Sequence, residues 1–143
     1  MLSRSDHLLL PRQLCEEMIQ HAQTELPNEC CGLLAGVREG KLLRVRTVHR
    51  LVNELASPTK YLSDGASMFK AERAMREAGH EIIAVYHSHP TSEPIPSRTD
   101  LEWEYYTDLV HFIIGLSGPE PTVRGWWLGR NEFHEAFWEI AEA

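Results

Sequence analysis

Two histidines separated by one residue follow the most apolar segment of the chain. His87 and His89 come directly after residues 82–86, a continuous apolar run that predicts a strand covered on both faces. Because side chains alternate along a strand, both imidazoles should point to the same side and can reach one metal ion. Asp100 can supply a carboxylate if the proline-rich loop of residues 88–97 folds it back. Two histidines and one carboxylate leave a fourth tetrahedral position for water, the pattern of catalytic rather than structural zinc.

These residue types alone leave a plainer interpretation open. A His-x-His pair also occurs by chance, at surfaces or in hydrogen-bonded positions. Ser97 and Asp100 have the spacing of a helix N-cap with its capping partner, so part of their role is structural. Glu29 would by itself be read as a solvated carboxylate at the start of a strand. Cys30 and Cys31 are better explained as packed side chains than as a nucleophile or metal ligands, and their role stays open.

Helices alternating with strands predict an α/β or α+β domain with a single mixed β-sheet flanked by helices. The first helix starts at Pro11 and ends over residues 25–28, before a hairpin of two strands. The predicted elements after it are a strand over residues 30–36, a strand ending near His49, a loop over residues 50–63, a helix between Asp64 and Gly79, the strand over residues 82–86, a helix from Ser97 to about Asp108, and strands over residues 111–116, 122–128 and 133–140.

Length, charge and cysteine content exclude several classes of protein. The 143 residues predict one domain, and a net charge of −7 argues against a broad nucleic-acid-binding surface. We expect no membrane segment, because no apolar run approaches the roughly 18 residues that one requires. Three cysteines, two of them adjacent, imply no disulfide framework and favour a reducing, cytoplasmic location.

The same residues resemble the signature of the JAMM (MPN+) metallopeptidases. His87, His89, Ser97 and Asp100 reproduce its spacing, H-x-H-x7-S-x2-D, and residues 27–32, PNECCG, are similar to the P-x-E-C-C-G segment of small bacterial members. The resemblance covers roughly residues 8–140 and implies the cytidine-deaminase-like JAMM/MPN fold over a single domain, residues 1–143. It assigns one zinc ion to both histidines and Asp100, with a water in the fourth position. Glu29 would be the general acid/base beside that water, and Ser97 would stabilise the oxyanion.

The resemblance also implies a substrate. JAMM enzymes hydrolyse amide or isopeptide bonds at the tails of ubiquitin-like proteins, and compact bacterial members are similar to enzymes that process ubiquitin-like sulfur carriers after a Gly-Gly tail. We therefore expect a zinc peptidase or isopeptidase whose partner is such a carrier. The tail would add as a strand beside the hairpin strand before Asn53, under a flap of residues 50–63. A metal-dependent hydrolase of small-molecule amides and a non-catalytic MPN binding module are the alternatives, and the oligomeric state is open.

Overall fold

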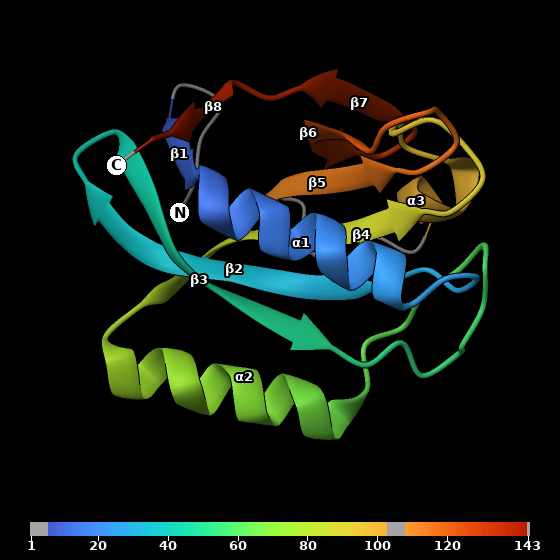
Figure 1. The fold of residues 1–143 in the computed structure, drawn as a ribbon. Coiled ribbons are helices and arrows are strands. Elements are labelled where there is room, and N and C mark those ends of the chain that lie inside the picture. The colour runs from blue at the N-terminus through green and yellow to red at the C-terminus, as the bar shows by residue number, and fades with distance from the viewer. Residues whose placement is uncertain (1–5, 103–107, 143) are drawn as a thin grey trace.

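Eight strands form one mixed sheet in the computed structural model, which describes residues 6–102 and 108–142 (Figure 1). Their order across the sheet is β7-β6-β5-β4-β2-β3-β1-β8. In chain order the strands are β1 (His7–Pro11), β2 (Cys31–Glu39), β3 (Leu42–Leu51), β4 (Glu81–His89), β5 (Val110–Gly115), β6 (Thr122–Gly129), β7 (Glu132–Glu135) and β8 (Trp138–Ala141). The predicted class, a single mixed sheet flanked by helices, is confirmed.

Three helices accompany this sheet: α1 (Arg12–Thr24), α2 (Gly65–Ala78) and α3 (Arg98–Glu102). The predicted ends of α2 are confirmed, because the Asp64 side chain accepts a hydrogen bond from the Ser67 amide and Gly79 ends the helix in the left-handed region, at φ 72°. The helix predicted from Ser97 to about Asp108 is α3 as far as Glu102, and residues 103–107 lie outside the described residues. None of the described helices is long and apolar enough to cross a membrane.

The central strand β4 has a helix on each side, as its apolar sequence predicts. It lies between β2, which is antiparallel to it, and β5, which is parallel. Tyr86 points toward α1, where its hydroxyl contacts the His21 ring at 2.7 Å, while the neighbouring Val85 lines a pocket together with Met68 of α2. Consecutive strand residues face opposite sides of a sheet, so α1 and α2 cover opposite faces of β4 (Figure 1).

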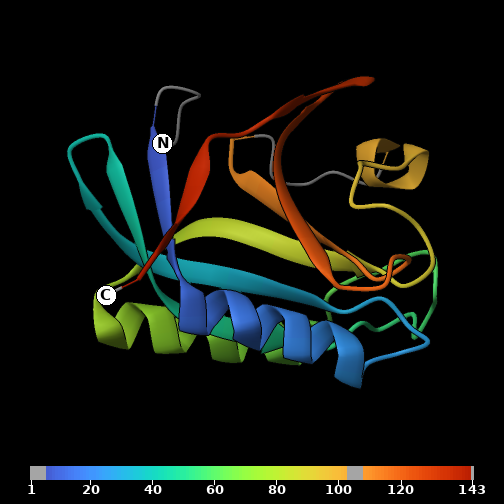
Figure 2. The same ribbon diagram turned by 45° about the horizontal axis from the view of Figure 1, so that its top comes forward.

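One sequence prediction about the edges of the sheet is wrong, and one strand near an edge was not predicted. Residues 133–140 were expected to form one strand, but they form β7 and β8, which lie at opposite edges. β8 pairs with β1, a parallel partner of β3 that the sequence analysis did not predict. The sheet curls enough for the short segment between β7 and β8 to reach from one edge to the other (Figure 2). Such pairing joins residues far apart in sequence, and no turn motif signals it.

Candidate metal centre

Three side chains converge at the end of β4. The Nε2 atoms of His87 and His89 lie 3.2 Å apart, and each lies 3.0 Å from one carboxylate oxygen of Asp100. The potential ligand atoms of these three residues all lie within 4.8 Å of one another. Both imidazoles are almost completely buried, and the Asp100 side chain is 6% exposed. The structure therefore brings together the three residues that the sequence analysis assigned to a metal ion, and that assignment itself stays a prediction.

Asp100 owes its position to the start of α3. The Ser97 hydroxyl accepts a hydrogen bond from the Asp100 amide at 3.0 Å, and the Ser97 amide donates to Asp100 Oδ2 at 2.9 Å. This reciprocal pair is a capping box with an aspartate in place of the usual glutamate or glutamine. Because the Ser97 hydroxyl accepts here, its own proton is left to donate elsewhere. The capping interpretation of Ser97 is thus correct, and the hydroxyl can still act as a hydrogen-bond donor.

The two imidazoles are oriented by different contacts. His89 Nδ1 lies 2.8 Å from the Glu93 carbonyl, so its N–H donates there and Nε2 faces Asp100 and His87. The His87 ring stacks on Tyr61, with centroids 4.8 Å apart and an interplanar angle of 25°. No hydrogen-bond partner for His87 Nδ1 is found in residues 6–102 and 108–142, so this stacking and the contact of Nε2 with Asp100 orient the ring.

The pKa values of Asp100 and His89 are shifted by their surroundings. Burial raises the pKa of Asp100, but the charge of His87 and the hydrogen bonds from both imidazoles outweigh it, so the pKa lies far below its usual range. Burial lowers the pKa of His89, but its hydrogen bond and charge interaction with Asp100 outweigh that effect and raise it. Asp100 is therefore ionised, and once the imidazoles are neutral the three residues offer a divalent cation one carboxylate and two nitrogen ligands.

Glu29 lies beside this cluster at the start of β2. The Cys30 amide donates to the Ser88 hydroxyl at 2.8 Å and the Ser88 amide donates to the Cys30 carbonyl at 3.2 Å, so this segment runs alongside the histidine-bearing end of β4. Glu29 is 4% exposed, which contradicts the solvated interpretation of this residue. Burial first, and then the nearby Asp100 charge, raise its pKa to about 8, and its Oε1 atom is buried with no hydrogen-bond partner in the described part of the chain. Such a carboxyl can hold a proton and give it up near neutral pH.

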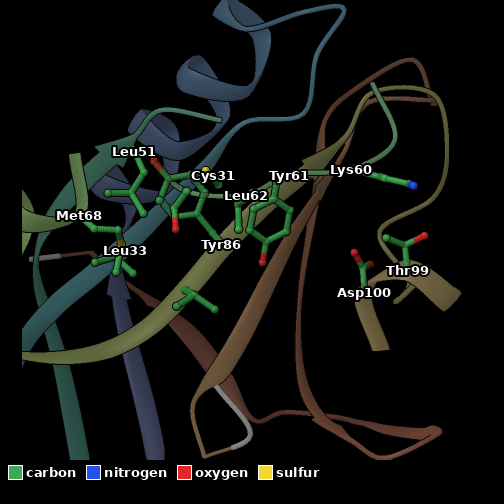
Figure 3. A pocket seen from close by; sticks show the side chains of 13 residues that line it. Cys31, Leu33, Leu51, Lys60, Tyr61, Leu62, Met68, Tyr86, Thr99 and Asp100 are labelled. Carbon is green, nitrogen blue, oxygen red and sulfur yellow. The ribbon is translucent and has the colours of Figure 1, made fainter. Parts of the chain in front are cut away.

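A pocket opens next to Asp100, beneath the loop that precedes α2 (Figure 3). It encloses about 630 Å³, including the part open to solvent. Its lining is mostly apolar and comes from β2, β3, β4, α2, α3 and the loop, and includes Leu33, Leu51, Tyr61, Met68 and Val85. Cys31 also lines it, whereas Cys30 does not. All three cysteines are free, and burial raises the pKa of the Cys30 and Cys31 thiols to about 12, so packing, not thiolate chemistry, explains both.

The edge that the sequence analysis assigned to the substrate tail is displaced from the centre. β2 lies between β3 and β4, so the strand before Asn53 is separated from the two histidines by a whole strand. The loop after β3 is the segment beside the centre, through Tyr61. The sequence analysis missed Tyr61 as a functional candidate and treated Asn53 only as a loop residue, because neither belongs to a periodic pattern.

Comparisons with known proteins identify the family. A family profile described as "Prokaryotic homologs of the JAB domain" matches residues 11–129. The chain is 34% identical over 112 residues to the CysO-cysteine peptidase of Mycobacterium tuberculosis, covering 78% of this chain and 75% of that protein. It is 41% identical over 112 residues to a probable TtuB-protein conjugate cleaving protease of Thermus thermophilus, covering 78% and 72%. A desampylase of Haloferax volcanii is 31% identical, with coverage of 80% and 84%.

Solved structures agree with these sequence comparisons. The fold matches the solution structure of a Desulfitobacterium hafniense protein with a TM-score of 0.86 at 31% identity, covering 96% of this chain and 94% of that one. The predicted JAMM/MPN resemblance and the predicted enzyme class, a hydrolase of the peptidase type, are confirmed by the family and by relatives that are themselves peptidases. The chain belongs to the prokaryotic homologs of the JAB domain.

Proposed function

We propose that His87, His89 and Asp100 bind one zinc ion, and that the protein hydrolyses the amide bond after the C-terminal Gly-Gly tail of a ubiquitin-like sulfur-carrier protein. The observation that carries this proposal is the convergence within 4.8 Å of two buried imidazoles and the Asp100 carboxylate, whose side chain is 6% exposed, beside the buried carboxyl of Glu29. The first half of the proposal concerns the ion, and the second concerns the substrate.

The donor set fits zinc. Two imidazoles and one carboxylate are the ligands of catalytic zinc sites, which keep one coordination position open. Harder cations such as magnesium and calcium prefer oxygen ligands, of which this centre offers only those of Asp100 among the described residues. The hydrogen bond from His89 to the Glu93 carbonyl is the kind of outer contact that fixes a zinc-binding imidazole.

Each nearby residue has a role that its surroundings support. Zinc, when bound, supplies Lewis-acid chemistry that polarises a carbonyl and makes water more acidic. Glu29 has a raised pKa and one carboxyl oxygen without a partner among the described residues; its ionised form accepts the proton of the attacking water, and its protonated form returns that proton to the departing amine. The Ser97 hydroxyl accepts a hydrogen bond in capping α3, so its own O–H can donate a hydrogen bond to the oxygen on which negative charge develops.

The substrate class rests on the relatives and on the pocket. Three relatives are a CysO-cysteine peptidase, a probable TtuB-protein conjugate cleaving protease and a desampylase. Their names favour conjugates of ubiquitin-like proteins as the substrate class. An extended tail suits the pocket, since Gly residues pass through a narrow channel and an apolar side chain further along can enter the apolar lining. The protein would act as one catalytic domain over residues 1–143, and the cytoplasmic location expected from its cysteines stays a prediction.

Intact-mass spectrometry of three substrates tests this function. The first is a ubiquitin-like carrier ending in Gly-Gly-Cys, the second is the same carrier joined through Gly-Gly to a lysine side chain, and the third is a small acyl-amino-acid amide. We expect cleavage after the second glycine of one or both carrier substrates, and loss of that cleavage in the His87→Ala/His89→Ala variant. Cleavage of the small amide alone would overturn the carrier assignment and favour the amidohydrolase. No cleavage of any substrate by the zinc-loaded protein would favour a binding module.

A further inference from the structure

The loop between β3 and α2, residues 52–63, is organised around one side chain. We call this segment the flap. Asn53 Nδ2 donates to the Lys60 carbonyl at 2.9 Å and to the Glu29 carbonyl at 3.1 Å. Asn53 Oδ1 accepts from the Leu55 and Leu62 amides, each at 3.1 Å. A carboxamide has two N–H donors and two acceptor lone pairs, so all four are engaged. Asn53 therefore joins the beginning of the flap to its end and joins the flap to Glu29.

The main chain of Glu29 is held by the flap on both sides. Its amide donates to the Ser57 carbonyl at 2.8 Å, and its carbonyl accepts from Asn53. These two bonds set the orientation of the peptide planes before and after the Glu29 Cα, and the direction of the side chain follows from them. The carboxyl itself has one oxygen without a partner in the described part of the chain, so its own hydrogen bonds do little to position it. The flap does.

The other end of the flap contacts the metal centre. Tyr61 stacks on the His87 ring, and Tyr61 and Leu62 line the pocket beside Asp100 (Figure 3). Leu62 is also bound through its amide to Asn53. One short segment thus touches the proposed general acid/base, a metal-binding imidazole and the pocket for the substrate. Asn53 is the residue that holds these three contacts in a fixed relation.

We propose that Asn53 is a positioning residue that couples the flap to Glu29, so that the carboxyl is aligned only while the flap is in place. The inference rests on the proposed function, because it gives Glu29 a catalytic role. Its physical basis is that a displacement of a catalytic group by about 1 Å costs on the order of 10²-fold in rate. Asn53 touches no reacting atom, and its effect passes through the main chain of Glu29.

Two substitutions separate the parts of this network. Asn53→Asp has nearly the same shape and keeps the acceptor for the Leu55 and Leu62 amides, but it loses the donated bonds to the Glu29 and Lys60 carbonyls. Asn53→Ala loses all four bonds. Thr59→Ala is the matched control in the same flap, because the exposed Thr59 has a hydroxyl 3.4 Å from that of Ser57 and its side chain does not hydrogen-bond to Glu29.

Zinc content, turnover and amide hydrogen exchange are measured on each zinc-loaded protein. Both Asn53 variants should keep one zinc per chain and lose about 10²-fold in kcat on a cleavable Gly-Gly carrier, with a smaller change in KM. The Glu29 amide should exchange faster in both, whereas the Leu62 amide should become exposed only in Asn53→Ala. Amides of β4 should stay protected, and Thr59→Ala should match the wild type in every measurement.

Three results would overturn the inference. They are an unchanged kcat in Asn53→Asp and Asn53→Ala, a loss of kcat that only follows a loss of zinc, and a Glu29 amide that exchanges as in the wild type. A wild-type protein that cleaves no Gly-Gly substrate would instead overturn the proposed function. The exchange of the Glu29 amide, which needs no substrate, then still decides whether Asn53 holds that segment.

Discussion

Glu29→Gln should remove most of the activity and at the same time stabilise the metal-free protein at alkaline pH. Glutamine has the size of glutamate but cannot accept a proton from water at neutral pH, and general acid/base help typically contributes 10²–10⁴-fold to a rate. We expect kcat to fall by at least 10²-fold. Zinc content should remain at one per chain, because Glu29 is assigned beside the ion and not to it.

The stability gain follows from the raised pKa of Glu29. Its pKa rises from 4.5 to about 8 on folding, chiefly because the carboxyl is buried. The protonated form is therefore favoured in the folded state, so its contribution to stability is complete below pH 4.5 and is lost as the pH rises through 8. At about 1.4 kcal/mol per pH unit, the loss is on the order of 5 kcal/mol. Glutamine does not titrate, so at this position it causes no loss of stability over this pH range.

Urea unfolding of chelator-treated wild type and Glu29→Gln at pH 4 and pH 9 measures this difference. The two proteins should have similar free energies of unfolding at pH 4, and the variant should be more stable by several kcal/mol at pH 9. Equal stability at both pH values would refute the argument that Glu29 is a buried carboxyl with a raised pKa. Loss of zinc from Glu29→Gln would refute its assignment outside the coordination shell.

Three further predictions concern single side chains. Replacing any one metal-binding residue by alanine should reduce bound zinc, measured by elemental analysis, to well below one per chain, because two ligands enclose an ion poorly; these residues are His87, His89 and Asp100. Ser97→Ala should cost about 0.5–2 kcal/mol of stability in thermal unfolding through the lost cap, and about 10²–10³-fold in kcat if Ser97 also serves the oxyanion; a normal kcat would leave only the cap. His21 has a pKa lowered to about 4 by burial, so its contribution to the free energy of unfolding falls by about 3 kcal/mol between pH 6.5 and 4; the stability of the wild type relative to His21→Gln in urea unfolding should fall by this amount over that range, and parallel pH profiles of the two would contradict this.

The central part of the fold could be predicted because its signals are local. The apolar run of β4 predicts its burial, and Asp64 and Gly79 predict the two ends of α2 through capping chemistry. The edges could not be predicted in this way. β1 has five residues and pairs with strands that lie far along the chain, and β7 and β8 are adjacent in sequence but lie at opposite edges. Alternation of side chains indicates a strand but not its partner.

The candidate site also combines features that local sequence predicts with features that it does not. The spacing of His87, His89 and Asp100 predicts their convergence, because a strand end and a capped helix start are both local geometries. The burial of Glu29 and the stacking of Tyr61 depend on the flap, which is held by the four hydrogen bonds of the Asn53 side chain together with main-chain bonds such as that from the Glu54 amide to the Leu62 carbonyl. An asparagine in a loop has the same sequence signature whether it caps a turn or holds a catalytic segment.

Titration of zinc into the metal-free protein, with release of the group after Gly-Gly followed by mass spectrometry, tests the central claim most directly. The metal-free protein should be inactive. Activity should rise linearly with added zinc until one zinc per chain is bound, and then stay constant. The His87→Ala/His89→Ala variant, titrated in parallel, should stay inactive throughout. Full turnover by the chelated protein, or equal activation of the double variant, would contradict a zinc-dependent reaction at His87, His89 and Asp100.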